Sequence, residues 1–512
     1  MAPMIPLSFL APLALLLVAA LALRRPGRRP GALPRQSEAG TLIALALVAL
    51  GGLQYLSQGP VSGLLRADAI SLSLALLVAF LGWVVIRFSR SYLDGEAREG
   101  AFHGQMLATL AAVLILVQAG NLWLLAGTAV AVGLGLKHLL LFYADRPEAR
   151  RAARKFTLAW HGGDGALILA ALLLTARFGT TDLAQLATLS THDGLGSAGG
   201  LAVALLVLAA LLKCAAFPLH GWLTEVMEAP TPVSALLHAG IINSGGVILL
   251  ATAPLVQQSP GAMAALVMAG GFTALFGATV MLTQSAVKTA LAWSTVAQMG
   301  FLMLQCGLGL WPLALLHILA HSLYKAHAFL SSGGAVTAVA ALRRPGPVAV
   351  PDLGAVLKSF ALALLLYAMI AGLFMTVLGA KSPQALALGA ILILGVAYLV
   401  AQGLADMAPA PLTRRTALAS LAAATGYFTF QALAQALWGP ALPAAPTPGP
   451  LEWALILLAL ASFGLVALAQ ALFPLWAHHP AMAGLRVHLA NGLYLNALLD
   501  RALGGLRTGK TS

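Results

Sequence analysis

Apolar runs of about twenty residues alternate with short polar breaks along the whole chain. A run of that length is what an α-helix needs to cross a hydrocarbon core of roughly 30 Å. The pattern therefore predicts an all-α polytopic membrane protein with about 14–15 transmembrane helices. The predicted spans are residues 5–23, 41–57, 69–88, 104–118, 121–143, 158–177, 200–222, 232–256, 262–283, 287–309, 311–334, 359–379, 384–405, 415–437 and 451–474.

Composition supports this class. Apolar residues make up 60% of the 512 residues and charged residues only 9%, whereas a soluble domain carries about 25% charged residues. The first apolar run has no positive charge before it and is followed by Arg24 and Arg25. That order predicts an uncleaved first helix rather than a signal peptide.

Basic residues are distributed unevenly between the two predicted faces of the membrane. Most lie in loops after odd-numbered spans and in the C-terminal tail, whereas the opposite loops hold Arg66, Arg177 and Lys381. The positive-inside rule then predicts a multi-pass protein of the bacterial inner membrane, with a periplasmic N-terminus and a cytoplasmic C-terminus. The net charge of +13 does not indicate nucleic-acid binding, because these residues sit at helix ends rather than in one patch interleaved with aromatic residues.

Four lysines fall within or at the edge of apolar spans. They are Lys137, Lys213, Lys288 and Lys325. Each charge at the centre of a bilayer costs about 3 kcal/mol on insertion scales, so ionisable residues there are functional candidates.

The densest group of polar residues begins at Lys213. Pro218 is expected to break the helix, and the freed backbone carbonyls can bind ions or water. Lys213 and His220 are seven residues apart, about two helical turns, so we expect them on one side of a helix. Glu225 and Glu228 would supply counter-charges, although each is also consistent with a helix end at the interface. The alternative to an ion-translocation site is a structural ion-pair network around a kink.

A second group lies in one apolar span. His317, His321 and Lys325 follow an i, i+4, i+8 spacing and should form one polar stripe. Histidine titrates near neutral pH, so such a row can pass protons along. The alternative is a metal site, because HxxxH places two imidazoles on one face. No glutamate lies between the histidines, and no third ligand is evident nearby.

Weaker candidates flank these groups. They are Lys137, His138, His161, Asp164, Lys288 and Lys381. The first four would extend the polar line or lie at interfaces beside the basic loop 146–155. The last two would extend it or reach the membrane surface.

Several kinds of chemistry have no motif here. The chain has no GxxxxGK[ST], no GxGxxG after a strand, no zinc-ligand constellation and no CxxCH, and Cys214 and Cys306 form no CxxC pair. We therefore expect no cofactor, no enzymatic activity in this chain, and energy from an ion gradient or a partner.

These residues resemble a known family. The stretches KCAAFPLHGWLTEVMEAPTPVSALLHAG (213–240), QSAVKTALAWSTVAQMGF (284–301) and HILAHSLYKAHAFL (317–330) resemble the antiporter-like subunits of respiratory complex I and of Mrp Na⁺/H⁺ antiporters. The resemblance implies two inverted five-helix repeats with two broken helices. It also implies a polar axis that includes Lys213, His238, His321, Lys325 and Lys381.

The resemblance also implies a division of the chain. Residues 1–100 would be N-terminal transmembrane helices, 101–256 the first repeat, 257–405 the second repeat, and 406–480 C-terminal transmembrane helices. Residues 481–512 would form a cytoplasmic tail, with an amphipathic helix at 482–508 lying on the membrane or on a partner.

One departure from the family concerns the fifth helix. The respiratory subunits carry a glutamate where this chain has Val130, so the usual Glu/Lys couple is incomplete, and Lys137 or His138 would alter it. His220 in FPLHGWL and the short length are most similar to the membrane subunits of the DAB inorganic-carbon accumulation family. That similarity implies a cytosolic DabA-like zinc protein as partner, resembling a β-carbonic anhydrase and driven by H⁺ or Na⁺.

Three functions follow as hypotheses. The first is a cation-translocating subunit, with H⁺ the expected ion, that energises CO2/bicarbonate uptake through this partner. The second is a subunit of a complex I-like oxidoreductase or of an Mrp-type cation/H⁺ antiporter. The third is a structural membrane anchor whose polar residues hold helices together.

Overall fold

The computed structural model of the chain describes residues 5–334, 353–404, 409–476 and 479–502. Within these ranges the protein is helical and contains no β-strand, only isolated β-bridges. Each of the predicted spans overlaps at least one helix, but the spans 200–222 and 232–256 are interrupted rather than continuous. Eleven helices of the described ranges are long and apolar enough to cross a membrane, so the prediction of an all-α polytopic membrane protein is confirmed.

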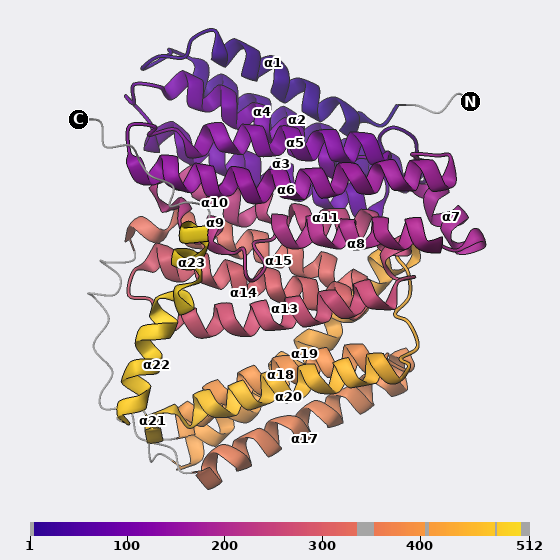
Figure 1. Cartoon of the computed structure of the whole chain (residues 1–512), viewed down its shortest axis with the longest axis vertical. Coiled ribbons are helices and arrows are strands. Elements are labelled where there is room, and N and C mark those ends of the chain that lie inside the picture. Colours follow the sequence, from indigo (N-terminus) through magenta and orange to yellow (C-terminus); the bar gives the residue numbers. More distant parts are fainter. Residues whose placement is uncertain (1–4, 335–352, 405–408, 477–478, 503–512) are drawn as a thin grey trace.

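The helices run side by side in one bundle (Figure 1). The N-terminal half contains α1 (Ala11–Leu23), α2 (Leu33–Gln58), α3 (Ala69–Tyr92), α4 (Glu99–Val117), α5 (Leu122–Leu140), α6 (Pro147–Phe178), α7 (Leu183–Asp193) and α8 (Gly196–Lys213). The middle contains α9 (Gly221–Thr224), α10 (Thr231–Ala239), α11 (Ser244–Ala251), α12 (Ala253–Val256), α13 (Pro260–Met281), α14 (Val287–Gly307) and α15 (Trp311–Leu330). The C-terminal part contains α17 (Leu353–Leu378), α18 (Pro383–Leu404), α19 (Pro409–Trp438), α20 (Pro450–Ala471), α21 (Phe473–Trp476), α22 (Pro480–Ala490) and α23 (Leu495–Ala502).

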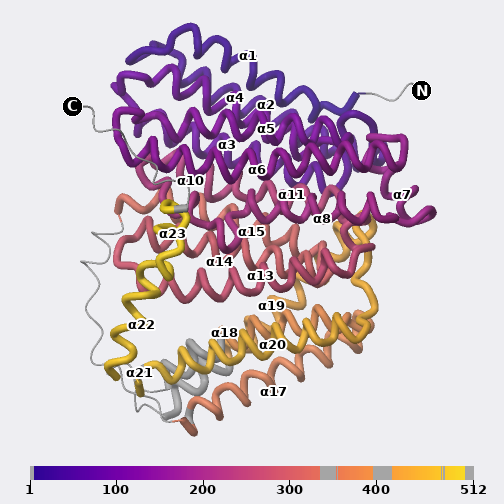
Figure 2. Tube along the Cα trace, in the orientation of Figure 1, coloured from indigo at the N-terminus to yellow at the C-terminus, as the bar shows by residue number. Residues whose placement is uncertain are grey.

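Chain order is largely preserved in space. The N-terminal helices lie at one edge of the bundle, α8–α15 in the middle and α17–α20 at the other edge (Figures 1 and 2). One contact between distant parts of the chain is Trp438 Nε1, which donates to Ser73 Oγ at 3.0 Å and ties α19 to α3. The inverted repeats and the predicted division of the chain remain predictions.

Glycines allow α13 and α14 to pack closely. A Cβ atom built on Gly270 would lie 2.6 Å from the amide nitrogen of Leu304, and one on Gly277 would lie 2.7 Å from that of Ala297. Small residues let helices in membranes approach closely, where van der Waals contact rather than the hydrophobic effect holds them together. Helices α13 and α14 therefore pack closely along their length, and α14 also packs against α15.

The helix predicted to break at Pro218 does break. Helix α8 ends at Lys213, Ala215 has a φ of 51°, and the Phe217–Pro218 peptide bond is cis. The short helix α9 and a 3-10 turn at Val226–Glu228 follow. The expectation that Lys213 and His220 share a helical face is wrong, because the residues between them are not helical.

A second break separates α10 from α11. Gly240 has non-helical dihedrals (φ −120°, ψ −76°) and precedes a 3-10 turn at Ile241–Asn243. Two helix interruptions therefore lie close together in sequence, one on each side of the residues 221–239.

The C-terminal tail differs from its prediction. Instead of one helix over 482–508, the described part forms α22, a turn at Gly492–Tyr494 with Leu493 at a φ of 52°, and α23. This segment runs across the helix ends (Figure 1). It contacts other parts of the chain: Gln284 Nε2, in the loop between α13 and α14, donates to the Ala490 carbonyl at 3.2 Å, and Asp500 lies 2.7 Å from Lys155 of α6.

Candidate functional site

The first buried group joins α6 to α8. Lys213 Nζ lies 2.6 Å from Asp164 Oδ1, and the two side chains are 0% and 5% exposed. Asp164 Oδ2 lies 3.0 Å from His161 Nδ1. Lys213 Nζ also lies 4.0 Å from the ring centroid of Trp160, a cation–π contact. Asp164, one of the weaker candidates, is therefore the counter-charge of Lys213.

Glu225 and Glu228 are not counter-charges of Lys213. Glu225 lies 2.6 Å from Lys155 Nζ and 3.6 Å from Arg151 Nε. Glu228 lies 2.9 Å from Arg146. The prediction that they pair with Lys213 or His220 is wrong, because both carboxylates face the basic start of α6. They tie the broken segment 221–228 to that helix.

His220 lies in an aromatic pocket. It is 1% exposed, and the centroids of the Phe217, Phe276 and Trp293 rings lie 5.0–6.1 Å from that of its imidazole. Its Nδ1 has no hydrogen-bond partner among the described residues. The structure thus separates His220 from the Lys213–Asp164 pair.

The second buried group links α10, α14 and α15. His238 Nδ1 lies 3.1 Å from Thr295 Oγ1, and its ring stacks on Phe329 with a centroid distance of 4.3 Å. His321 Nε2 lies 3.2 Å from the His238 carbonyl. The carbonyl can only accept, so in this arrangement His321 carries its proton on Nε2.

The polar stripe predicted for His317, His321 and Lys325 is present on α15. The rings of His317 and His321 are 5.9 Å apart. His317 Nδ1 lies 2.8 Å from Gln305 Oε1. Lys325, 0% exposed, donates to the Leu291 carbonyl at 3.0 Å and to Ser294 Oγ. Hydroxyl groups such as Ser294 both donate and accept, which suits a chain of proton carriers.

Side chains satisfy the backbone where α10 and α11 separate. Asn243 Nδ2 donates to the Ala239 carbonyl at 3.1 Å and to Ser322 Oγ on α15 at 3.0 Å. Cys214 Sγ, next to Lys213, donates to the Ile242 carbonyl at 3.3 Å. Freed backbone groups inside a membrane need such partners. The break therefore adjoins both buried groups.

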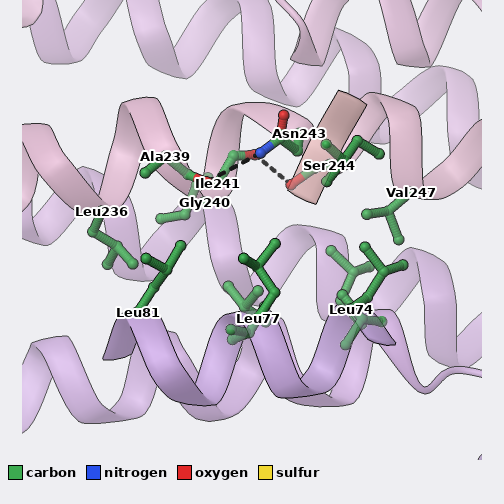
Figure 3. A pocket seen from close by; sticks show the side chains of 15 residues that line it. Leu74, Leu77, Leu81, Leu236, Ala239, Gly240, Ile241, Asn243, Ser244 and Val247 are labelled. Atoms are coloured by element: carbon green, nitrogen blue, oxygen red, sulfur yellow. Dashed lines mark hydrogen bonds between the residues drawn. The ribbon is translucent and has the colours of Figure 1, made fainter. Parts of the chain in front are cut away.

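A cavity of about 30 Å³ lies beside this break but is apolar (Figure 3). Leu74, Leu77 and Leu81 of α3 point towards it, while the Asn243 oxygen points away. A cavity with apolar walls stays dry. This cavity is therefore not part of a polar path.

The remaining candidates lie apart from both groups. Lys137 is half-buried on α5, and the exposed His138 contacts the Leu134 carbonyl of its own helix at 2.7 Å. Lys288 donates to Thr231 Oγ1 at 3.3 Å. Lys381 lies half-buried between α17 and α18, without a hydrogen-bond or ion-pair partner in the described part of the chain. Groups of three or more His, Cys, Asp or Glu side chains able to hold a metal are absent from the described residues.

The uncharged side chains that contact the candidate residues were not predicted from the sequence. Trp160, Asn243, Ser294, Thr295 and Gln305 contact the candidate residues. Gln305 and Asn243 carried a usable signal, because amides are uncommon in apolar spans. Serine, threonine and tryptophan are common there and gave none.

Both buried groups lie in a part of the chain that is similar to a known family. Residues 119–344 match the family described as NADH:quinone oxidoreductase/Mrp antiporter, transmembrane. That segment contains both buried groups.

Curated relatives match a similar part of the chain. The probable inorganic carbon transporter subunit DabB2 of Halothiobacillus neapolitanus is 47% identical over 270 residues, 52% of this chain and 49% of the relative. Subunit DabB of Hydrogenovibrio crunogenus is 43% identical over 271 residues, 52% of each chain. NADH-quinone oxidoreductase subunit L of Mycobacterium tuberculosis is 35% identical over 280 residues, 54% of this chain and 44% of the relative. The chain thus spans about half the length of the curated relatives it matches.

Solved structures share the fold over nearly the whole chain. A chain of the Mrp complex from Dietzia sp. DQ12-45-1b superposes with a TM-score of 0.62 at 22% identity, covering 97% of this chain and 59% of that one. A chain of an archaeal membrane-bound sulfane sulfur reductase gives 0.57 at 16% identity, covering 96% and 98%. The chain is therefore a multi-span membrane protein, and its residues 119–344 are similar to the NADH:quinone oxidoreductase/Mrp antiporter transmembrane family.

Proposed function

We propose that the chain is the cation-translocating membrane subunit of an inorganic-carbon uptake complex, with H⁺ as the ion. The 43–47% identity to subunits named as probable inorganic carbon transporter subunits supports the choice of complex. The observation that carries translocation is the Lys213–Asp164 ion pair, 2.6 Å long and buried between two apolar helices. A buried ion pair adds little net stability compared with apolar residues of the same volume. The presence of the pair is therefore best explained by a role in ion translocation.

In this proposal, protons move between two stations. Asp164 and Lys213 form the first, at the break after α8. His238, His321, His317 and Lys325 form the second, along α15, with Thr295, Ser294 and Gln305 as hydrogen-bonding partners. The break between α10 and α11 lies between the stations, where small backbone shifts would connect or separate them. Lys381 stands as a third, more distant candidate.

The chemistry is assigned to a partner. The proposed partner is a cytosolic DabA-like zinc protein that hydrates CO2, while this chain supplies ion-driven energy from the bacterial inner membrane. The proposed orientation has the N-terminus in the periplasm and the C-terminus in the cytoplasm. The segment α22–α23 then lies on the cytoplasmic face, beside the break near Lys213, where a partner would be close to the first station.

A second candidate function is a subunit of a complex I-like oxidoreductase or of an Mrp-type antiporter. It is favoured by the 35% identity to NADH-quinone oxidoreductase subunit L and by the likeness to a chain of an Mrp complex. The buried groups would then serve the same translocation in another assembly.

Co-expression with the proposed DabA-like zinc protein, in a bacterial strain lacking carbonic anhydrase, tests the proposal. We expect growth in ambient air that needs both proteins and stops when an uncoupler is added. Lys213→Ala should abolish this growth. Lys358→Ala, which removes an exposed lysine of α17, should preserve it at equal expression.

Growth with Lys213→Ala inserted at wild-type levels would argue for the structural-anchor hypothesis. Growth that never depends on the soluble protein, together with Na⁺/H⁺ exchange by the purified chain in liposomes, would favour the second candidate function.

A further inference from the structure

A cavity of about 130 Å³ lies where α13, α14, α18 and α20 meet. Its lining residues lie at the C-terminal end of α14 and at the N-terminal ends of α13, α18 and α20. Its lining includes Gln257, Gly307, Leu308, Gln384, Pro446 and Glu452. A cavity of this size has room for several water molecules. Three polar side chains, Gln257, Gln384 and Glu452, lie among its mainly apolar walls, so it can hold a hydrated ligand at that polar part.

The amide nitrogens around this cavity are already used. Gln384 Nε2 donates to the Pro446 carbonyl at 2.7 Å, and Gln257 Nε2 donates to the Ala444 carbonyl at 2.8 Å. Because carbonyl oxygens only accept, these contacts set the orientation of both amides. The Gln257 oxygen in turn accepts from Trp311 Nε1 at 2.6 Å.

Two acceptors remain for a ligand. Gln384 is 2% exposed, and its Oε1 has no partner among the described residues. Glu452 Oε2 accepts the Gly449 N–H at 2.9 Å, which leaves the other carboxylate oxygen for a ligand. No ion pair joins Glu452 to Lys381, or to any other basic side chain, in the part of the chain that the structure describes. The cavity therefore offers oxygen acceptors and one carboxylate that no basic side chain of the described residues pairs with.

We infer that this cavity binds a hydrated monovalent alkali cation through Gln384 Oε1 and the Glu452 carboxylate. A buried acceptor without a donor calls for a ligand that supplies positive charge or protons. A single carboxylate with an amide oxygen suits a monovalent cation better than Ca²⁺, which takes six to eight oxygen ligands and usually several carboxylates.

The cavity lies between two parts of the chain. Helices α13 and α14 belong to the family-matched segment 119–344, whereas α18 and α20 lie outside it. Gln257 also contacts Trp311, the first residue of α15, which carries His317, His321 and Lys325 further along. A cation bound here would lie at the end of α15 opposite Lys325. The inference concerns binding, and it does not depend on the proposed function.

Thermal unfolding of the purified full-length chain in detergent tests the inference. Melting temperatures would be measured in 100 mM NaCl, KCl and choline chloride. A ligand that binds the folded state raises the melting temperature. We expect the wild type to melt about 2 °C higher or more in one of the alkali chlorides than in choline chloride. Equilibrium binding of radioactive ²²Na⁺ would give the number of sites.

The variants identify the site. Glu452→Gln should abolish the cation-dependent shift while keeping the Gly449 contact, because an amide oxygen also accepts a hydrogen bond. Glu148→Gln, which neutralises an exposed carboxylate of α6, should keep the shift. Equal melting temperatures in all three salts would overturn the inference, as would a shift that persists in Glu452→Gln. Neither result would bear on growth dependent on Lys213.

Discussion

Lys213 on α8 and Asp164 on α6 form an ion pair of 2.6 Å from which solvent is excluded. The two residues are 49 positions apart in the chain. The ammonium group also faces the ring of Trp160, whose Nε1 donates to the Ala129 carbonyl on α5 at 3.1 Å. The charge pair is thus held among three neighbouring helices. The carboxylate of this pair comes from the sixth helix, α6.

Breaking this pair should destabilise the protein. Asp164→Asn leaves Lys213 buried without a counter-charge, which typically costs about 3–5 kcal/mol. We expect a lower melting temperature for the purified chain and loss of carbon-dependent growth.

A double variant separates stability from translocation. Asp164→Leu combined with Lys213→Met removes both charges, so it should regain most of the stability lost in Asp164→Asn. Growth in air should remain absent. If this double variant supported growth at wild-type rates, the pair would have no part in ion transfer.

Substitutions of His321 distinguish a role in proton transfer from a purely structural role. In His321→Gln the side-chain amide still donates to the His238 carbonyl but cannot take up a proton. We expect near-normal melting for this variant, and for His321→Leu a loss of about 1–3 kcal/mol from the unsatisfied carbonyl. Both should lose ion translocation, measured as uncoupler-sensitive growth. Normal growth of His321→Gln would mean that the residue only holds α10 against α15.

Glu228 should tolerate neutralisation. In its ion pair with Arg146, the Glu228 side chain is 40% exposed and the Arg146 side chain is 47% exposed. Exposed ion pairs contribute at most about 1 kcal/mol to stability. Glu228→Gln should therefore melt close to the wild type and support growth, assayed beside Asp164→Asn. Loss of growth in both variants would restore Glu228 as a member of the translocation path.

The contact between α13 and α14 predicts a matched pair of glycine variants. Gly270→Ala would place a methyl group 2.6 Å from the Leu304 amide nitrogen and force the helices apart, at a typical cost of about 1–3 kcal/mol. Gly271→Ala meets no atom closer than 4.0 Å and should be neutral. Unfolding of both variants in detergent checks this, and equal stability of the two would contradict the close packing.

The sequence by itself determined the helical spans and one of their interruptions, at Pro218. Helix length against bilayer thickness is a local property, so the apolar spans could be read directly. The break before Pro218 followed from ring geometry, which acts on neighbouring residues. The predicted stripe of His317, His321 and Lys325 is present in the structure because all three residues lie on one continuous helix, α15.

Tertiary structure alone decided which charges meet. Spacing suggested that His220 would accompany Lys213 and that Glu225 would balance it, yet the helix ends at Lys213 and Glu225 faces Lys155. The actual partners, Asp164 for Lys213 and the His238 carbonyl for His321, lie 49 and 83 residues away. Helical periodicity relates residues within one or two turns, whereas contacts between helices depend on how small residues and bulky side chains let whole faces pack.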